Sequence, residues 1–189
     1  PAGGRALDIG CNTGVNLRAL GQSWDRFGVE LSATLAQIAK QFVPATVYTL
    51  PIEELDEPHS SFDLITAHAV IEHLYDPSAF IKRCHDLLRP GGLLVIMTGD
   101  RESVLAKKLG CRWPLYVSRD HVSFFSARSL RHLLQKQQFR IIDEDWRYMY
   151  FADGVGSFGR RLLMKIQEVF EQLPRETFDI YYVYAIKSA

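Results

Sequence analysis

The stretch that decides the fold is RALDIGCNTG, residues 5–14. Its first half is largely apolar, as in a short buried strand, and residues 15–20 beyond it have the spacing of a helix. Gly10 and Gly14 lie between the two. Glycine lets a backbone turn sharply and come close to a ligand. This order predicts a ligand-binding loop of an α/β protein, although such a turn also occurs in α/β proteins that bind nothing there.

A second predicted strand, residues 26–29, ends at Glu30. An acidic residue at this place in an α/β unit is positioned to accept hydrogen bonds from ribose hydroxyls. The glycine loop and Glu30 together predict a cofactor that contains adenosine, bound at the carboxyl edge of a sheet.

The spacing within the loop distinguishes two kinds of adenosine cofactor. A dinucleotide loop has the spacing G-x-G-x-x-G, and the pyrophosphate sits at the helix N-terminus. Here the spacing is D-x-G-x-x-x-G, from Asp8 to Gly14, with Asn12 where a middle glycine would stand. The Asp8 carboxylate would repel a pyrophosphate and attract an ammonium group. The loop therefore favours a cofactor with an amino-acid half, such as S-adenosylmethionine, over a nicotinamide cofactor.

Apolar runs and helical patterns alternate along the rest of the chain. Runs rich in Val, Ile, Leu and Phe predict buried strands at residues 25–31, 46–50, 62–67 and 92–98. Helical patterns occur at residues 33–42, 77–88 and 126–137. Near the end, residues 140–148 are strand-like, 158–172 are helical and 179–187 alternate as in a final strand. This alternation predicts a mainly parallel sheet with helices on both faces.

Four stretches follow one another in the order typical of a single family. They are LDIGCNTG (7–14), SFDLITAHAVIEHL (61–74), LLRPGGLLVI (87–96) and DHVSFFS (120–126). With these landmarks the chain resembles the class I S-adenosylmethionine-dependent methyltransferases. The last stretch is similar to the small-molecule branch that includes the ubiquinone-type O-methyltransferases. The resemblance extends over nearly the whole chain.

The resemblance implies a Rossmann-like α/β fold in a single domain, residues 1–189. Its doubly wound sheet would have seven strands in the order 3-2-1-4-5-7-6, with strand 7 antiparallel. Ligands of such sheets bind beyond the carboxyl ends of the strands, where the strand order reverses. In the family, helices usually precede the first strand. Only residues 1–4 do so here, and we therefore expect the chain to lack those N-terminal helices.

The resemblance also implies roles for particular residues. The implied cofactor-binding residues are Asp8, Gly10, Cys11, Asn12, Gly14, Glu30, Leu31, Ile52, Ala67 and His68. Those of the glycine loop would surround the methionine half, the glutamate would hold the ribose, and the leucine and isoleucine would pack on adenine. The family often has an acidic residue just before that isoleucine. This chain has Pro51 there, which weakens the expectation of a contact to the adenine amino group.

His73 and His121 are the expected catalytic residues. Imidazole titrates near neutral pH and can take a proton from an acceptor hydroxyl. Both histidines also have a structural interpretation, because His73 can brace the following helix and His121 can tie down its loop. We expect the acceptor to enter beside these two and His68. The aromatic residues Trp113, Tyr116, Tyr148 and Tyr150 fit either an acceptor pocket or the core.

Composition narrows the class of protein. Lys and Arg number 22, as do Asp and Glu, so the formal net charge is zero and a large nucleic-acid surface is not expected. The apolar runs are too short to span a bilayer. Cys11, Cys84 and Cys111 have no metal-ligand spacing. We expect reduced thiols, a cytoplasmic location, no membrane partner and no metal.

The expected function is methyl transfer from S-adenosyl-L-methionine to a small-molecule acceptor, at oxygen. Two alternatives belong to other classes. One is a nicotinamide-dependent oxidoreductase with an irregular glycine loop. The other is a non-catalytic binding domain that keeps a methyltransferase-like fold.

Overall fold

The computed structural model describes residues 3–147 and 178–188. The strands are β1 (Gly4–Ile9), β2 (Trp24–Val29), β3 (Thr46–Tyr48), β4 (Phe62–His68), β5 (Leu88–Gly99), β6 (Phe139–Arg147) and β7 (Ile180–Lys187). The α-helices are α1 (Val15–Ala19), α2 (Ala33–Phe42), α3 (Pro77–Leu87), α4 (Val104–Leu109), α5 (Pro114–Val117) and α6 (Ala127–Lys136). Short 3-10 helices are η1 (Ile52–Glu54), η2 (Ile71–His73) and η3 (Gly110–Arg112).

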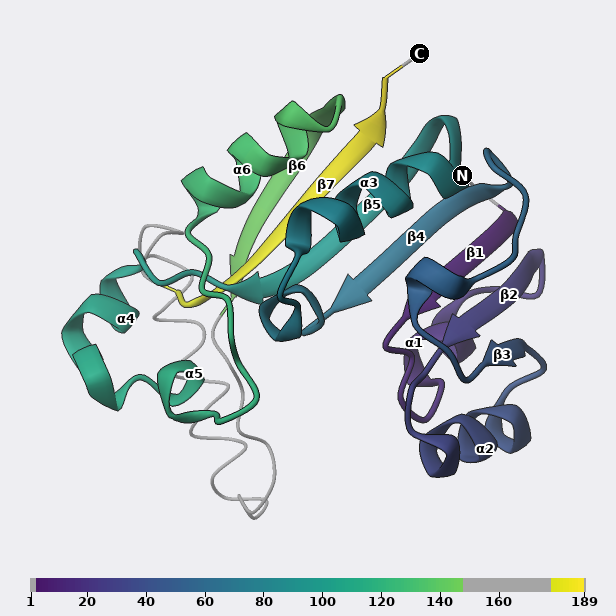
Figure 1. Cartoon of the computed structure of the whole chain (residues 1–189), viewed down its shortest axis with the longest axis horizontal. Coiled ribbons are helices and arrows are strands. Elements are labelled where there is room, and N and C mark those ends of the chain that lie inside the picture. The colour runs from purple at the N-terminus through teal and green to yellow at the C-terminus, as the bar shows by residue number, and fades with distance from the viewer. Residues whose placement is uncertain (1–2, 148–177, 189) are drawn as a thin grey trace.

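The strands form one sheet in the order β3-β2-β1-β4-β5-β7-β6 (Figure 1). The first five strands in the chain pair in parallel, and β7 runs antiparallel to both of its neighbours. This confirms the predicted order and the predicted antiparallel strand. The order reverses at β1 and β4, so the loops that follow these strands leave in different directions and open a crevice between them.

The larger part of the core lies on the face covered by α3 and α6 (Figure 1). Alternate residues of each strand point to this face, as Leu7 and Ile9 do from β1. Phe80 of α3 and Leu130 of α6 meet them and are fully buried. These helices press against the sheet and hold the loop after β4 in place.

Helices α1 and α2 pack on the opposite face. Phe27 and Val29 of β2 belong to the larger core, so Gly28 between them faces the other way. A Cβ atom on Gly28 would come within 2.6 Å of Cys11 Sγ, which packs with Leu17 of α1. The helices therefore cover both faces, as the alternating pattern predicts.

Side-chain caps fix where two helices begin. Asp76 accepts a hydrogen bond from the backbone N–H of Ala79 (2.9 Å), and Pro77 occupies the first position of α3. Ser126 and Ser129 form a reciprocal capping box at the start of α6. These caps determine the direction in which each helix leaves the carboxyl edge of the sheet.

The structure differs from the sequence-based expectation mainly between β5 and α6. Helices α4 and α5 were not predicted, because at 6 and 4 residues they are too short to show a helical period. The strand expected at 92–98 begins earlier, at Leu88, with a register shift against β4. The predicted helix 158–172, Tyr148 and Tyr150 lie outside the described residues. Among the described helices, none has the length and apolar character needed to cross a membrane.

Candidate functional site

The loop between β1 and α1 has the left-handed backbone that its sequence requires. Gly10 has φ +70° and Gly14 has φ +82°. A Cβ atom on Gly10 would lie 2.6 Å from Val70 Cγ2, in the loop after β4. Asn12 also has a positive φ, +49°, which asparagine tolerates better than most residues. Asn12 therefore replaces a middle glycine without changing the turn.

Glu30 holds this loop against the end of β2. One carboxylate oxygen accepts a hydrogen bond from the backbone N–H of Asn12 (3.0 Å), and the other from that of Ser32 (2.8 Å). Both contacts fix the carboxylate at the mouth of the crevice. Each oxygen keeps a further lone pair, so the carboxylate can still accept hydrogen bonds from two hydroxyls of a ligand.

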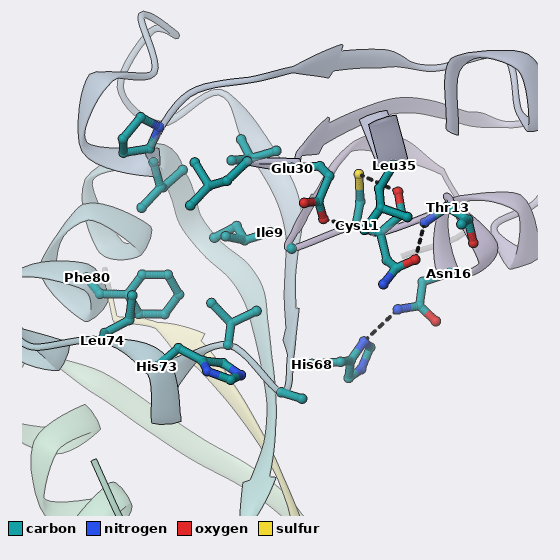
Figure 2. Close-up of a pocket in the computed structure, with 18 of the residues that line it drawn as sticks. Ile9, Cys11, Thr13, Asn16, Glu30, Leu35, His68, His73, Leu74 and Phe80 are labelled. Atoms are coloured by element: carbon teal, nitrogen blue, oxygen red, sulfur yellow. Dashed lines mark hydrogen bonds between the residues drawn. The ribbon is translucent and has the colours of Figure 1, made fainter. Parts of the chain in front are cut away.

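A cavity of about 700 Å³ occupies the crevice (Figure 2). Its walls come from the loops after β1, β2, β3 and β4, the four strands around the reversal of strand order. The lining is mostly apolar, with Ile9, Leu35 and Phe80 among its residues. Among the described lining residues, Glu30 and Glu53 are acidic and none is Lys or Arg. The volume suits a small-molecule ligand, and the charge favours a cationic one.

Seven of the ten residues expected to bind the cofactor line this cavity. They are Gly10, Cys11, Asn12, Glu30, Leu31, Ile52 and His68. Leu31 is 67% exposed, so its side chain can move over a ligand. Ile52 is 4% exposed and forms a fixed part of the cavity wall. Burial, with the charges of Asp8 and Glu30, raises the pKa of Cys11 to about 12. Its neutral thiol therefore acts as apolar lining.

Asp8, Gly14 and Ala67, the other three, do not line the cavity. Gly14 packs toward Ala39 of α2 and toward Val43, the residue that follows this helix. Ala67 is fully buried in the larger core. These two support the walls from behind.

Asp8 is buried beside the neighbouring strand. Oδ1 accepts a hydrogen bond from Thr66 Oγ1 (2.6 Å), and Oδ2 has no hydrogen-bond partner among the described residues. Burial raises the pKa of Asp8 to about 6, while hydrogen bonds from Thr66 and Asn16 act in the opposite direction. An unpartnered buried carboxylate oxygen is costly, and it is suited to a cationic group.

His68 is a hydrogen-bond donor to the cavity rather than a base. The Asn16 amide nitrogen donates to His68 Nδ1 (2.9 Å), so the ring proton of the neutral imidazole is on Nε2. Burial lowers the pKa of His68 and keeps the ring uncharged. Figure 2 shows His68 and His73 along one border of the cavity, with Glu30 on the other side.

His73 and His121 come together although they are far apart in the sequence. Their ring centroids are 4.8 Å apart. His73 lines the large cavity, and His121 lies behind it with Glu72, at a small cavity of about 10 Å³. Each ring donates its Nδ1 proton to a backbone carbonyl, His73 to Asp120 and His121 to Leu115. His121 thus ties down its own loop, as considered above, whereas His73 holds that same loop and not the helix that follows it. In a neutral ring this bonding leaves Nε2 as the acceptor.

The aromatic residues near this pair divide between core and surface. Trp113 is 1% exposed and donates from Nε1 to Asp179 (2.8 Å), so it belongs to the interior. Tyr116 packs edge-on against Trp113 and Phe124 and is 39% exposed. Of these side chains, Tyr116 and Phe124 remain accessible to an acceptor.

Four residues near the site were not predicted from the sequence. They are Asn16, Glu53, Thr66 and Glu72. Glu53 follows Ile52 directly, so its place in the cavity lining was open to prediction from the local sequence. The others take their position from contacts between distant segments, which no short pattern indicates.

Fold and site together define a class of protein. The sheet order, the glycine loop beside Glu30 and a cavity without lysine or arginine are features of Rossmann-like proteins that bind an adenosine cofactor bearing positive charge. A family model described as a methyltransferase domain matches residues 1–144. The chain belongs to this methyltransferase family, whose cofactor is S-adenosyl-L-methionine.

Individual relatives agree with this assignment. The chain is 34% identical over 169 residues to a ubiquinone biosynthesis O-methyltransferase of Bradyrhizobium sp., covering 80% of this chain and 65% of that protein. It is 35% identical over 112 residues to the enzyme of the same name from Xanthomonas axonopodis pv. citri, covering 53% of this chain and 45% of that protein. The chain thus spans less than two thirds of the length of these relatives.

Solved structures confirm the fold. An S-adenosylmethionine-dependent methyltransferase of Thermotoga maritima, described as a possible histamine N-methyltransferase, superposes with a TM-score of 0.70. The match covers 98% of this chain and 82% of that one, at 21% identity. The likeness concerns the fold alone.

Proposed function

We propose that this chain binds S-adenosyl-L-methionine and transfers its methyl group to a hydroxyl oxygen of a small molecule. The observation that carries the proposal is the charge of the cavity, whose lining, in the part of the chain that the structure describes, has two glutamates and no lysine or arginine. A sulfonium and an ammonium group are attracted by such a lining, whereas a pyrophosphate is repelled. The O-methyltransferase names of the curated relatives support oxygen as the acceptor atom.

The residues of the cavity suit the parts of this cofactor. The carboxylate of Glu30 would accept hydrogen bonds from the ribose hydroxyls, and Leu31 and Ile52 would enclose the adenine. At the other end, His68 offers an N–H donor for a carboxylate, and Asp8 offers a buried carboxylate for an ammonium group. This arrangement directs the sulfur toward the border formed by the loop after β4.

The cofactor supplies an electrophilic methyl group on a positively charged sulfur. The protein has to hold the acceptor oxygen in line with that methyl, at about 3–3.5 Å, and exclude water. His73 lines the cavity at this border, and His121 lies behind it; in a neutral ring whose Nδ1 donates to a carbonyl, Nε2 is the atom that can accept a proton. The acceptor would lose its proton toward this pair as the oxygen–carbon bond forms and the carbon–sulfur bond breaks.

Ligand binding and turnover test the proposal separately. S-adenosylhomocysteine at 100 times its Kd should stabilise the chain by about 2.7 kcal/mol, and NAD should give no shift in Tm. Transfer of a labelled methyl group to a panel of phenols and aliphatic alcohols tests turnover. A Tm shift with NAD and none with S-adenosylhomocysteine would support the oxidoreductase alternative. Binding without transfer to any acceptor would support the non-catalytic one.

A cytoplasmic location stays a prediction.

A further inference from the structure

The loop before α6 is firmly docked onto η2. The backbone carbonyl of Glu72 accepts hydrogen bonds from the N–H groups of Val122 (2.9 Å) and Ser123 (3.0 Å). Ser123 Oγ donates to the Leu74 carbonyl (2.9 Å), and His73 donates to the Asp120 carbonyl (2.9 Å). Four hydrogen bonds between two distant segments therefore hold His73 and His121 next to each other as a fixed part of the fold.

Both imidazoles are oriented as ligands of a metal ion usually are. In protein metal sites, a ligating histidine donates its other ring N–H to a carbonyl or carboxylate, which fixes the tautomer and the ring direction. The Asp120 and Leu115 carbonyls do this for His73 and His121, at 2.9 and 2.8 Å. In each neutral ring, Nε2 then keeps its lone pair for a metal ion.

Glu72 completes the cluster with a buried negative charge. Its side chain is 5% exposed, and Oε2 accepts a hydrogen bond from Thr98 Oγ1 (2.9 Å). Within the part of the chain that the structure describes, no lysine or arginine forms an ion pair with it. A buried carboxylate is costly unless a positive charge is near. The other two members of the cluster are the imidazoles of His73 and His121.

We propose that Glu72, His73 and His121 bind a zinc ion at the acceptor side of the cavity. Their donor atoms lie within 4.8 Å of one another. Tetrahedral zinc separates its ligand atoms by about 3.4 Å, so rotations that move each atom by about 1 Å close the set. Two imidazoles and one carboxylate form a known ligand set for catalytic zinc, with the fourth position open. Magnesium prefers oxygen ligands and suits this set poorly.

The open position gives the ion a role in the reaction, and this role rests on the proposed function. His73 also lines the large cavity, so an acceptor in that cavity could reach the fourth position. The ion would coordinate the acceptor hydroxyl, lower its pKa and fix its direction. With the ion bound, the two imidazoles are ligands, so the proton would leave to solvent; they would act as the base only in the metal-free chain. The zinc would be unchanged at the end. Acceptors that ionise near neutral pH when coordinated, such as phenols, fit best.

Zinc binding is measured on untagged protein stripped with a chelator, by competition with a chromophoric chelator and by metal content after dialysis. The variants are His73→Gln and His121→Gln, with His132→Gln as the matched control because His132 is exposed on α6. We expect one zinc per chain in the parent and the control. Each of the two ligand variants should bind at least about 100-fold more weakly, since loss of a supporting contact alone costs 10–100-fold.

Binding of S-adenosylhomocysteine serves as the independent check of folding. His121 does not line the large cavity, so His121→Gln should keep cofactor affinity while losing zinc. The inference is overturned if the parent binds S-adenosylhomocysteine but no stoichiometric zinc, or if His121→Gln binds zinc as tightly as His132→Gln. If the parent binds zinc but not S-adenosylhomocysteine, the zinc site stands and the proposed function fails.

Discussion

Replacing Asp8 by asparagine should make the folded chain more stable at neutral pH. Burial raises the pKa of Asp8 from 3.8 to about 6 in the folded chain. An acid with a raised folded pKa holds its proton more tightly when folded than when unfolded. Its contribution to stability is therefore present at low pH and is lost as the pH rises from about 4 to about 6. Above that range the ionised carboxylate destabilises the fold.

The pKa shift sets the size of the effect. A shift of about two units corresponds to about 3 kcal/mol at neutral pH. Asparagine can still accept the hydrogen bond from Thr66 through its amide oxygen, while its NH₂ group takes the place of the unpartnered Oδ2. That group also lacks a partner and costs about 1 kcal/mol. We expect Asp8→Asn to gain about 2 kcal/mol at pH 7.5, where the full shift counts, and to lose about 1 kcal/mol near pH 4, where only the cost of the amide remains.

Urea unfolding of the parent and the variant at pH 4, 5.5 and 7.5 measures this difference. Asp86→Asn is a control in which the change in stability should have the opposite sign. Burial acts to raise the pKa of Asp86, but the hydrogen bond and charge of Lys82 outweigh it, and the pKa lies below its usual value. That variant should lose stability at pH 7.5. Equal or lower stability of Asp8→Asn at every pH would refute the reasoning. The same variant should bind S-adenosylhomocysteine more weakly, if Asp8 faces the ammonium group.

Two further variants test the cofactor site. Glu30→Ala should weaken S-adenosylhomocysteine binding by about 1.5–3 kcal/mol, roughly 10- to 150-fold in Kd, because a charged acceptor for two hydroxyls is lost. Calorimetry measures the affinity, with Glu54→Ala, outside the cavity, as the control. Unchanged affinity of Glu30→Ala would exclude Glu30 as the ribose ligand. Gly10→Ala and Gly91→Ala place alanine at similar positive φ, +70° and +74°, but only the Gly10 Cβ meets a neighbour. Gly91→Ala should cost about 1–2 kcal/mol, and Gly10→Ala about 1–3 kcal/mol more from overlap with Val70; equal losses in thermal unfolding would contradict this.

The fold was predictable because each strand and each long helix carries its own local pattern. Apolar runs mark the strands, and the resemblance supplies their order, including the antiparallel β7 that no periodicity indicates. Helices α4 and α5 escaped prediction because a helix of one or two turns shows no period. Boundaries moved by a few residues, as at Leu88, because strand pairing extends an element beyond its apolar run.

The candidate site divides in the same way. Glu30, Leu31 and the glycine loop follow their strands directly, so local sequence places them at the cavity. The contact of Asp8 with Thr66 joins residues 58 positions apart in the chain, and no local pattern indicates it. The joining of Glu72, His73 and His121 depends on the docking of one loop on another. Contacts of this kind arise only when the sheet has brought distant segments together.

The two edges of the sheet also influence how the chain behaves at high concentration. β3 is three residues long, and β6 carries Asp143, Glu144 and Asp145 with a register shift against β7. Short, charged or irregular edge strands are poor templates for pairing with a strand of another molecule. Growth of the sheet from one molecule into the next is therefore disfavoured at both ends. Aggregation by edge pairing should be slow even in concentrated solution.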